Sequence, residues 1–510
     1  MSNSPSTNQP LGGADGLSTL LLALPWLNPL IYGPTHAVPQ SLAVCLGAAL
    51  CWLVWELAQV QPGDRIRTVA AAWLLAATAS AGMGLVQYLG HAAPFSPWIN
   101  FVDAGQAYAN LRQRNQQATL LAIGLAALLW WQARLPTFGW AARTGWLAHT
   151  LLAIAAILLA GADAATGSRT GLFQLLLLLA LALLWRRGRV STALAFLAYG
   201  LAAYLLPRLA GLDPLQSGIL GRIGEAPSLC GSRLTLWSNV LHLIAQRPWT
   251  GWGWNELEYA HFITLYEGPR FCEILGNAHN LPLHLAVERG VPFALAVCGT
   301  GLWLALRAKP WREQDATRQM AWTVLAVIGL HSLLEYPLWY GPFQLAALLA
   351  LWMLWQTRSS WTVTPAQWSV VHRLALVLLL AGTLACSYAA WDYWRISQIY
   401  LPVAQRDAAY RADTLEKIRP SWLFADQVKF AELGVTTLAP ANAEHTHALA
   451  LQLLHFSPEP SVVIQLIESA KLLGRKDEVR YYSLRFQAAY PQPYADWLAA
   501  KGSDPDDKAP

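Results

Sequence analysis

The segment of residues 276–290 reads GNAHNLPLHLAVERG, and it closes a polar stretch that begins near Gly211 and ends at Gly290. The apolar runs on either side, near residues 190–210 and 286–307, are each long enough to cross a bilayer. A loop between two such runs need only connect them, yet this one is rich in Arg, His and aromatic residues. We therefore expect the polar stretch to carry the chemical site and the rest of the chain to form its scaffold.

The composition indicates a protein that crosses a membrane many times. Of the 510 residues, 55% are hydrophobic and only 13% are charged, whereas about 25% are charged in ordinary soluble domains. The 26 Trp residues gather near the ends of apolar runs, where indoles favour the membrane interface. The net charge of +5 comes from basic residues in short loops, so it gives no indication of a nucleic-acid partner.

Eleven apolar runs are predicted to be transmembrane helices, so the expected fold is an all-α polytopic membrane protein. They lie near residues 16–34, 38–59, 67–90, 116–134, 143–163, 169–186, 190–210, 286–307, 318–338, 341–357 and 370–390. No cleavable signal peptide is visible, because the first fifteen residues contain no Lys or Arg. The first run is therefore expected to stay as a signal anchor.

Orientation follows from the distribution of Lys and Arg among the short loops. With the N-terminus in the cytoplasm, the cytoplasmic loops would contain Arg65, Arg67, Arg134, Arg143, Arg186, Arg187, Arg189, Arg307, Lys309, Arg312, Arg318, Arg358 and Arg373. The opposite short loops contain only Arg112, Arg114 and Arg169. This bias predicts a cytoplasmic N-terminus and a C-terminal domain on the outer side, which in a Gram-negative bacterial cell would be the periplasmic side of the inner membrane.

Three parts are expected along the chain. Residues 1–390 would form a transmembrane domain that includes the outer loop of residues 211–285, and residues 391–500 a periplasmic helical domain. In that second part, apolar positions at helical spacing alternate with Pro-containing turns. Paired short helices of this kind resemble tetratricopeptide repeats. The last part, residues 501–510, is predicted to be disordered.

Arginines gather on the predicted outer side, in three separate loops: Arg112, Arg114, Arg169, Arg222 and Arg233. Any one of them could cap a helix end or bind a lipid headgroup. Their joint placement favours a common anion, because charged residues at the ends of membrane spans are costly unless they face water or a ligand. Guanidinium suits a phosphate, since it offers a planar, bidentate fork and keeps its charge.

A histidine supplies a candidate base. The segment of residues 276–290 is predicted to place His279, Asn280 and Glu288 along one helix that enters the eighth span. A His within reach of a hydroxyl can act as a general base, although a His that caps the helix or bonds a loop carbonyl is the plain alternative. A second polar cluster ends the ninth span, where interface aromatics would explain the tyrosines equally well: His331, Glu335, Tyr336 and Tyr340.

Carboxylates and cysteines give two further expectations. Only Glu256 and Glu258 stand together in the outer loops, so we expect no metal. Cys230 and Cys272 are the cysteines of the outer loop, a compartment that permits disulfides. A bridge between them would tie the ends of the polar stretch together, and two unrelated reduced thiols are the alternative. The remaining cysteines fall in predicted spans as small packing residues: Cys45, Cys51, Cys298 and Cys386.

Four motifs, in this order, resemble the O-antigen ligase and polymerase superfamily of bacterial glycosyltransferases. They are QRNQQAT (113–119), TGSRTG (166–171), SRLTLW (232–237) followed by RPWTGWGWNE (247–256), and AHNLPLHLAVERG (278–290). The chain departs from the usual family pattern at Gln116 and Gln117, where a His or Leu is common. Three features resemble the branch of O-linked protein oligosaccharyltransferases: LPWLNPLIYGP (24–34), HSLLEYPLWYGPFQ (331–344) and a tail entered through AAWDYWRISQIY (389–400).

The resemblance implies that a preassembled glycan passes from undecaprenyl pyrophosphate in the membrane to a Ser or Thr hydroxyl of a pilin or another exported protein, with no cofactor. His279 would be the base, and Arg233 and Glu288 would complete the catalytic group. The pyrophosphate would bind Arg169, Arg233, Arg114 and Arg222. Substrates would be positioned by Asn280, Asn115, His331, Glu335, Tyr336 and Tyr340.

Other functions remain open at this point. Within the superfamily, the chain could be an O-antigen ligase that transfers glycan to lipid A-core, or an O-antigen polymerase. A transporter usually places charges in the middle of its spans and shows internal repeats, and the sequence shows neither. A scaffold that recruits partners through the helical tail would leave the polar stretch unexplained.

Overall fold

The computed structural model describes residues 12–30, 32–35, 37–137, 141–224, 230–357 and 365–502. Within these ranges every regular element is a helix. The all-α class predicted from the sequence is therefore confirmed. The sequence predicts a disordered tail of residues 501–510. Of these, residues 503–510 lie outside the described residues.

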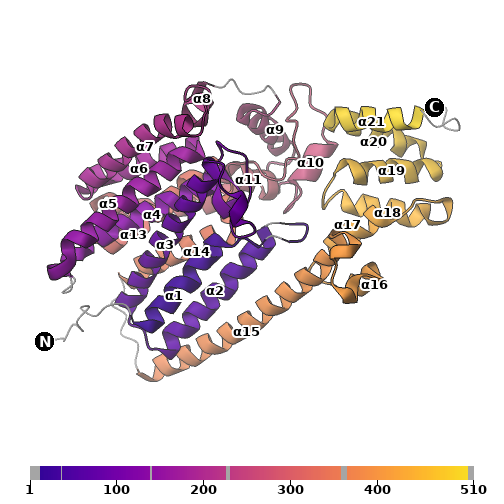
Figure 1. The fold of residues 1–510 in the computed structure, drawn as a ribbon. Helices are drawn as coiled ribbons and strands as arrows, with labels where there is room; N and C mark the ends of the chain where they lie inside the picture. Colours follow the sequence, from indigo (N-terminus) through magenta and orange to yellow (C-terminus); the bar gives the residue numbers. More distant parts are fainter. Residues whose placement is uncertain are drawn as a thin grey trace. The chain divides into compact units, whose positions relative to one another are not determined.

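A helix occupies each of the eleven predicted spans (Figure 1). These helices are α1 (Gly13–Ala23), α2 (Ala37–Leu57), α3 (Pro62–Tyr88), α4 (Arg114–Arg134), α5 (Ala141–Thr166), α6 (Arg169–Trp185), α7 (Arg189–Leu209), α12 (Val291–Ala308), α13 (Ala316–Ser332), α14 (Gly341–Gln356) and α15 (Pro365–Ser397). By length and composition, six of the described helices can cross a membrane: α2, α3, α5, α7, α12 and α15. Two shorter apolar helices, α1 and α6, accompany them.

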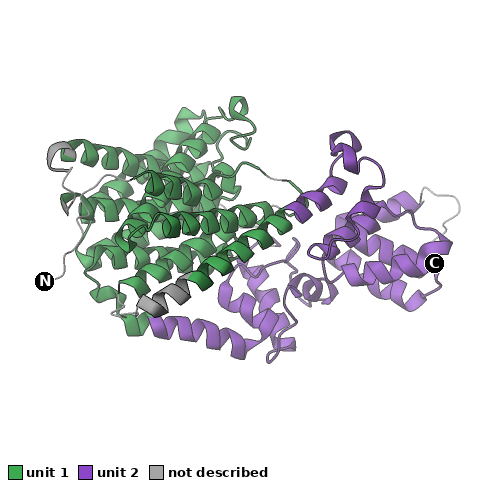
Figure 2. Cartoon of the chain, turned by 90° about the horizontal axis from the view of Figure 1, so that it is seen from below, with its two compact units in different colours: residues 1–225, 305–390 green, residues 226–304, 391–510 purple. Residues whose placement is uncertain are grey.

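The chain forms two compact units (Figure 2). Unit 1 contains residues 1–225 and 305–390, and unit 2 contains residues 226–304 and 391–510. The sequence-based division assigned the whole outer loop to the transmembrane domain. In the structure most of that loop packs with the C-terminal tail instead, because Phe262 shares a hydrophobic core with tail residues such as Phe486.

In unit 1, helix α4 lies at the centre and packs against α3, α5, α6 and α13. Its side chains from Gln116 to Leu128 are buried without interruption. Close packing depends on small residues: a methyl group added at Gly124 would lie 2.2 Å from the Cβ of Ala77 on α3. Small residues at such crossings let membrane helices approach closely. The polar first turns of α4 are consequently held inside protein rather than against lipid.

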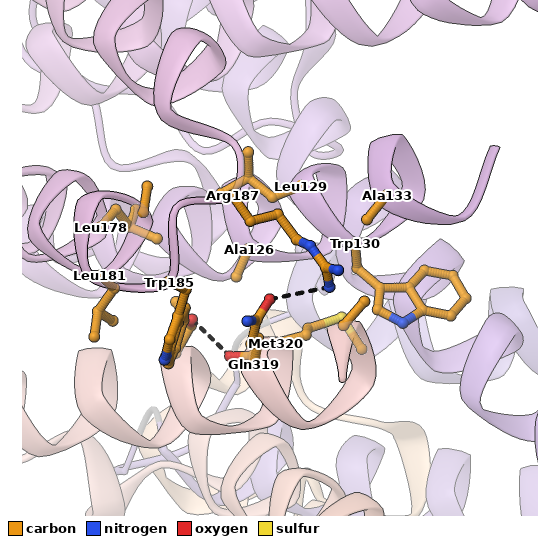
Figure 3. Close-up of a pocket in the computed structure, with 13 residues that line it drawn as sticks. Ala126, Leu129, Trp130, Ala133, Leu178, Leu181, Trp185, Arg187, Gln319 and Met320 are labelled. Carbon is orange, nitrogen blue, oxygen red and sulfur yellow. Dashed lines mark hydrogen bonds between the residues drawn. The ribbon is translucent and has the colours of Figure 1, made fainter. Parts of the chain in front are cut away.

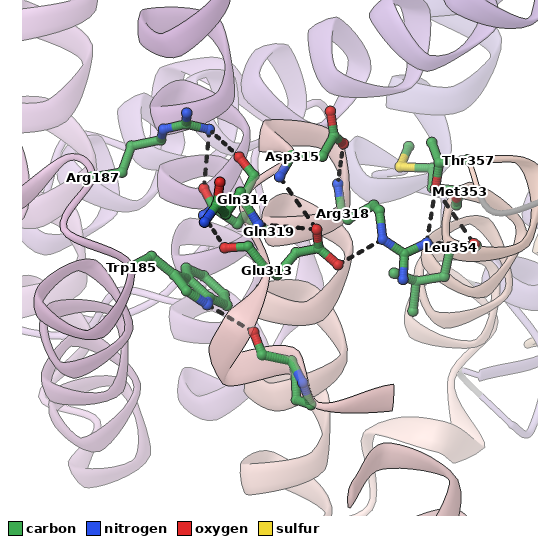
Figure 4. Close-up of polar contacts among 11 residues, drawn as sticks. Trp185, Arg187, Glu313, Gln314, Asp315, Arg318, Gln319, Met353, Leu354 and Thr357 are labelled. Atoms are coloured by element: carbon green, nitrogen blue, oxygen red, sulfur yellow. Dashed lines mark hydrogen bonds and ion pairs between the residues drawn. The ribbon is translucent and has the colours of Figure 1, made fainter. Parts of the chain in front are cut away.

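At the opposite end of α4, side chains from α4, α6 and α13 enclose a cavity of about 40 Å³ (Figure 3). Arg187 lines it and donates hydrogen bonds to the carbonyl oxygen of Gln314 (3.1 Å) and the side chain of Gln319 (3.3 Å) (Figure 4). Arg318 forms an ion pair with Glu313 (2.6 Å) beside it. None of the predicted site residues lines this cavity, and Arg187 belongs to a loop predicted to face the cytoplasm.

Unit 2 contains the short helices of the polar stretch and those of the tail. The first group is α9 (Arg233–Gln246), α10 (Leu257–Ile263) and α11 (Leu281–Arg289); α8 (Gly218–Gly224) belongs to unit 1. The tail helices are α16 (Thr414–Ile418), α17 (Ala425–Val435), α18 (Ala443–Leu453), α19 (Pro460–Leu472), α20 (Lys476–Ala489) and α21 (Pro491–Gly502). Consecutive tail helices from α17 to α21 pack against one another.

Candidate active site

The conformation around His279 differs from the sequence-based expectation. The prediction that His279, Asn280 and Glu288 share one helix continuing into the eighth span is wrong. Asn280 is the N-cap of α11, and its side-chain oxygen accepts a hydrogen bond from the N–H of Leu283 (3.1 Å). His279 therefore precedes the helix, with a backbone φ of 49°. Non-glycine residues rarely adopt this left-handed conformation, and it concentrates at functional sites.

Helix α11 also ends before α12 begins. Gly290 separates them with a φ of 87°, and a methyl group there would lie 2.2 Å from the carbonyl oxygen of Trp249. Beside it the N–H of Val291 donates to the carbonyl of Pro248 (2.8 Å). Only glycine fits this close approach, so the RPWTGWGWNE motif sets the break between the two helices.

The same motif anchors Glu288. The N–H of Gly253 donates to the carbonyl of Glu288 (3.0 Å), and the N–H of Asn255 donates to its carboxylate (3.0 Å). Glu288 is 2% exposed, and burial raises the pKa of its carboxyl to about 7 although the Asn255 N–H acts in the opposite direction. Through these two hydrogen bonds, the buried Glu288 fixes the conformation of the RPWTGWGWNE motif.

His284 lies on the same face of α11, with its Nε2 3.6 Å from Glu288 Oε2. Burial lowers the pKa of His284 to about 4, and the charge of nearby His279 acts in the same direction. His284 is therefore neutral near pH 7. This pairing was not predicted, although the spacing of four residues places both side chains on one helix face.

Arg233 and His279 come from neighbouring segments of unit 2. Arg233 is the first residue of α9, whose N-cap Ser232 accepts a hydrogen bond from the N–H of Thr235 (3.1 Å). One turn later, the indole N–H of Trp237 donates to the carbonyl oxygen of Ala278 (3.1 Å). Helix α9 thus contacts the backbone next to His279, and both Arg233 and His279 are partly exposed.

Cys230 and Cys272 form a disulfide in the structure, as the sequence analysis proposed. The N–H of Cys272 also donates to the carbonyl of Cys230 (3.3 Å). Nearby, the side chain of Asn239 donates to the Pro269 carbonyl (3.0 Å) and accepts from the N–H of Phe271 (2.8 Å). The loop before His279 is therefore fastened at two places, to the segment that precedes α9 and to the middle of α9.

Loss of this disulfide should destabilise unit 2. The bridge joins residues 42 positions apart, and closing a loop of that length stabilises the fold by roughly 4 kcal/mol in the chain-entropy model. We expect the Cys230→Ser/Cys272→Ser variant to unfold at a clearly lower temperature, with Cys298→Ser as the control. Peptide mapping without reductant checks the bond itself, and a Cys230 that alkylates freely would contradict it.

In unit 1 a hydrogen-bonded network joins three of the predicted positioning residues. The side chain of Asn115 accepts from Ser168 (2.6 Å) and donates to Glu335 (3.3 Å). On the next turn of α4, Thr119 bonds Nδ1 of His331 (2.8 Å). His331 is fully buried and Glu335 is 5% exposed, so both hold neighbouring groups in place and do not lie on an open surface.

The tyrosines of the HSLLEYPLWYGPFQ motif lie beside this network. The rings of Tyr336 and Tyr340 stack with centroids 5.8 Å apart. Burial raises the pKa of the Tyr340 hydroxyl, and the nearby side chains of Tyr336 and Gln116 act in the opposite direction. This turn therefore lies beside the first turn of α4. Nothing in the sequence indicated that Gln116 and Tyr340 would lie close together.

A pocket of about 760 Å³ in unit 1 contains two of the predicted arginines. Arg114 and Arg222 line it together with Gly167, whose carbonyl oxygen accepts a hydrogen bond from Arg222 (3.2 Å). Arg114 is partly buried and makes no hydrogen bond or ion pair with any residue that the structure describes. Arg169 is exposed and is not part of the lining. Within the described ranges, no group of three His, Cys, Asp or Glu side chains could hold a metal ion.

Three known sequence families match parts of this chain. The family described as "O-Antigen ligase" matches residues 154–298, and "Virulence factor membrane-bound polymerase, C-terminal" matches residues 319–503. "Protein glycosylation ligase" matches residues 107–131, the segment that contains Arg114 and Asn115. The similarity to the O-antigen ligase superfamily is confirmed.

Two curated relatives extend this similarity to protein oligosaccharyltransferases. A "General O-oligosaccharyltransferase" of Acinetobacter baylyi is 25% identical over 219 residues, which cover 41% of this chain and 36% of that protein. A "ComP-specific O-oligosaccharyltransferase" of the same organism is 24% identical over 242 residues, which cover 47% and 42%. The match thus spans less than half of either relative. No solved structure matches this chain.

Proposed function

We propose that this protein is an O-oligosaccharyltransferase, which transfers a preassembled glycan from undecaprenyl pyrophosphate to a Ser or Thr hydroxyl of an exported protein such as a pilin. The observation that carries the proposal is the 760 Å³ pocket lined by Arg114 and Arg222. The two curated relatives named as O-oligosaccharyltransferases support a protein acceptor.

The donor pyrophosphate would lie in this pocket. Arg114 makes no polar contact within the described part of the chain, so its fork is available for a phosphate without breaking an existing bond. Arginine charges neutralise the pyrophosphate as it leaves, which stabilises the charge that develops in the transition state. Arg222 lines the same pocket and is proposed as a second contact to the donor. That Arg169 and Arg233 also bind the donor stays a prediction from the sequence.

The acceptor hydroxyl would be activated by His279. A ring nitrogen takes the hydroxyl proton while the acceptor oxygen forms a bond to C1 of the glycan and the bond from C1 to the phosphate oxygen breaks. His279 has a left-handed backbone conformation, in which its N–H donates to the side-chain oxygen of Asn277 (2.9 Å). Glu288 orders the RPWTGWGWNE motif, and Arg233 acts beside His279 in this proposal. Asn115, Asn280, Tyr336 and Tyr340 are proposed to position substrates. His331 and Glu335 are buried, so they are proposed to act indirectly, by holding Thr119 and Asn115 in place.

A direct test uses the full-length protein purified in detergent, with an undecaprenyl-pyrophosphate-linked glycan and a candidate pilin. Mass spectrometry of the pilin should show the glycan mass on a Ser or Thr. Lipid A-core in place of the pilin tests the second candidate function, an O-antigen ligase, which the "O-Antigen ligase" match favours. Transfer to lipid A-core alone would overturn the protein-acceptor proposal.

The proposed orientation gives a topological prediction. Short loops rich in arginine, such as the one containing Arg187, would face the cytoplasm and the tail would face the periplasm. Alkaline phosphatase, which is active only outside the cytoplasm, should be active when fused after residue 395 and inactive when fused at Gly188. A β-galactosidase series should give the reverse pattern. Cytoplasmic activity of the fusion after residue 395 would contradict this orientation.

A further inference from the structure

Two of the three tryptophans in the RPWTGWGWNE motif (247–256) are exposed. Trp249 is 77% exposed and Trp254 is 53% exposed. Trp252 shows the contrast, because it turns inward and its indole N–H donates to the carbonyl of Leu243 (3.0 Å). Two large apolar side chains left uncovered on one short motif indicate a surface that contacts a partner.

The motif is fastened to the junction between α11 and α12. The N–H of Val291, the first residue of α12, donates to the carbonyl of Pro248, which directly precedes Trp249 (2.8 Å). The two residues that flank Trp254 both donate from their N–H groups to Glu288, near the end of α11 (3.0 Å each). The backbone that carries both exposed tryptophans is therefore held against the start of α12.

The length of α12 places this junction at the edge of the membrane. Its 18 residues give a helix of about 27 Å, and the hydrocarbon core of a bilayer is about 30 Å thick. Helix α12 is apolar enough to cross this core, and it needs its whole length to do so. Its first residue therefore lies where the hydrocarbon ends. The headgroup region extends about 5–8 Å beyond that point, and tryptophan side chains are favoured there.

Two exposed arginines accompany these tryptophans. The guanidinium of Arg247, the first residue of the motif, lies 4.1 Å from the ring centroid of Trp252. That of Arg289, the last residue of α11, lies 5.3 Å from the ring centroid of Trp254. Neither guanidinium makes a hydrogen bond or ion pair with a residue that the structure describes, so both can bind a phosphate through the bidentate fork. We propose that four exposed side chains bind phospholipid headgroups of the leaflet in which α12 begins, as a headgroup collar: Arg247, Trp249, Trp254 and Arg289.

The headgroup collar gives the motif a second role besides the break between α11 and α12. Arginine binds the lipid phosphate while the indole occupies the boundary between apolar and polar layers, so the collar holds the junction at a fixed depth. Helix α11, whose Glu288 bonds the motif, is held at the same surface. This inference concerns the lipid of the bilayer and does not depend on the proposed glycan transfer.

Photo-crosslinking in a bilayer tests the collar. Trp249→p-benzoylphenylalanine and Trp254→p-benzoylphenylalanine are made in the full-length protein, which is placed in nanodiscs with equal amounts of phosphatidylethanolamine and phosphatidylglycerol. After irradiation, mass spectrometry should find phospholipid adducts at both positions. Leu295→p-benzoylphenylalanine, at an exposed position of α12, is the positive control. Leu472→p-benzoylphenylalanine, at an exposed position that ends the tail helix α19, should give no adduct.

The arginines are tested through the choice of lipid. Each basic residue close to an anionic membrane surface favours the anionic lipid on the order of fivefold. Phosphatidylglycerol should therefore exceed phosphatidylethanolamine by about that factor among the adducts at position 249. Arg247→Gln/Arg289→Gln should remove this excess. Arg480→Gln, at an exposed position of α20, is the matched control and should leave it unchanged.

Two kinds of result would overturn the headgroup collar. Adducts at position 295 but not at positions 249 and 254 would show that the motif faces water, and adducts at position 472 would show that lipid contact is unselective. Equal amounts of the two lipids at position 249, or an excess that Arg247→Gln/Arg289→Gln retains, would show that the arginines do not bind headgroups. Thermal unfolding shows whether each variant is folded, and position 254 decides the question if the variant at position 249 unfolds.

Discussion

His279→Asn should abolish glycan transfer while the protein still folds and inserts. Asparagine tolerates the left-handed backbone conformation of residue 279 better than alanine does, so the φ of 49° remains accessible. Its side chain cannot take a proton from the acceptor hydroxyl. Loss of a general base lowers the rate by about 10²–10⁴-fold. The measurement is single-turnover transfer to the acceptor protein with saturating lipid-linked glycan.

A matched control for this variant is His242→Asn. His242 is an exposed residue of α9 in the same unit and contacts only the ring of Tyr266 within the described structure. We expect His242→Asn to retain full activity and both variants to unfold at the temperature of the unmodified protein. Normal turnover by a well-folded His279→Asn variant would show that His279 is not the base.

Arg114→Lys should impair transfer nearly as much as Arg114→Ala. Lysine keeps the positive charge but loses the bidentate fork that matches a phosphate. We expect the alanine variant to lower the rate by about 10²-fold, the usual effect of removing one group that stabilises transition-state charge. The lysine variant should recover little of the rate that the alanine variant loses. Rates at saturating donor, together with the affinity for undecaprenyl pyrophosphate, separate binding from catalysis.

Arg208→Lys is the control for that experiment. Arg208 is exposed in the last turn of α7, where its guanidinium lies 4.3 Å from the ring centroid of Tyr204. It does not line the 760 Å³ pocket, so its replacement should leave transfer unchanged. Full activity of Arg114→Lys would mean that Arg114 contributes only a diffuse charge, and the pocket would then lose its assignment as the pyrophosphate site.

Much of the helical framework could be predicted because its signal is local. A run of apolar residues long enough to span a bilayer must satisfy its backbone hydrogen bonds internally, and a helix does this within one segment. All eleven predicted segments therefore contain helices. The disulfide could also be predicted, because Cys230 and Cys272 are the two cysteines of the predicted outer loop.

Backbone geometry in the polar stretch could not be predicted in the same way. An Asn followed by Leu-Pro indicates a helix start, but the sequence does not reveal the positive φ of His279. The break at Gly290 depends on Trp249, which is 41 positions earlier and comes within 2.2 Å of an added methyl group. Such a contact exists only after both segments have folded against each other.

The sequence alone determined that this is an all-α chain with many apolar helices, that its polar stretch carries Arg and His, and that its motifs resemble O-antigen ligases. The tertiary structure decided which side chains meet. Arg114 and Arg222, 108 positions apart, line one pocket, and Asn115 reaches Glu335 across 220 positions. Hydropathy and helix propensity act within a few turns of the chain, whereas these pairings depend on how α4 packs among its neighbours.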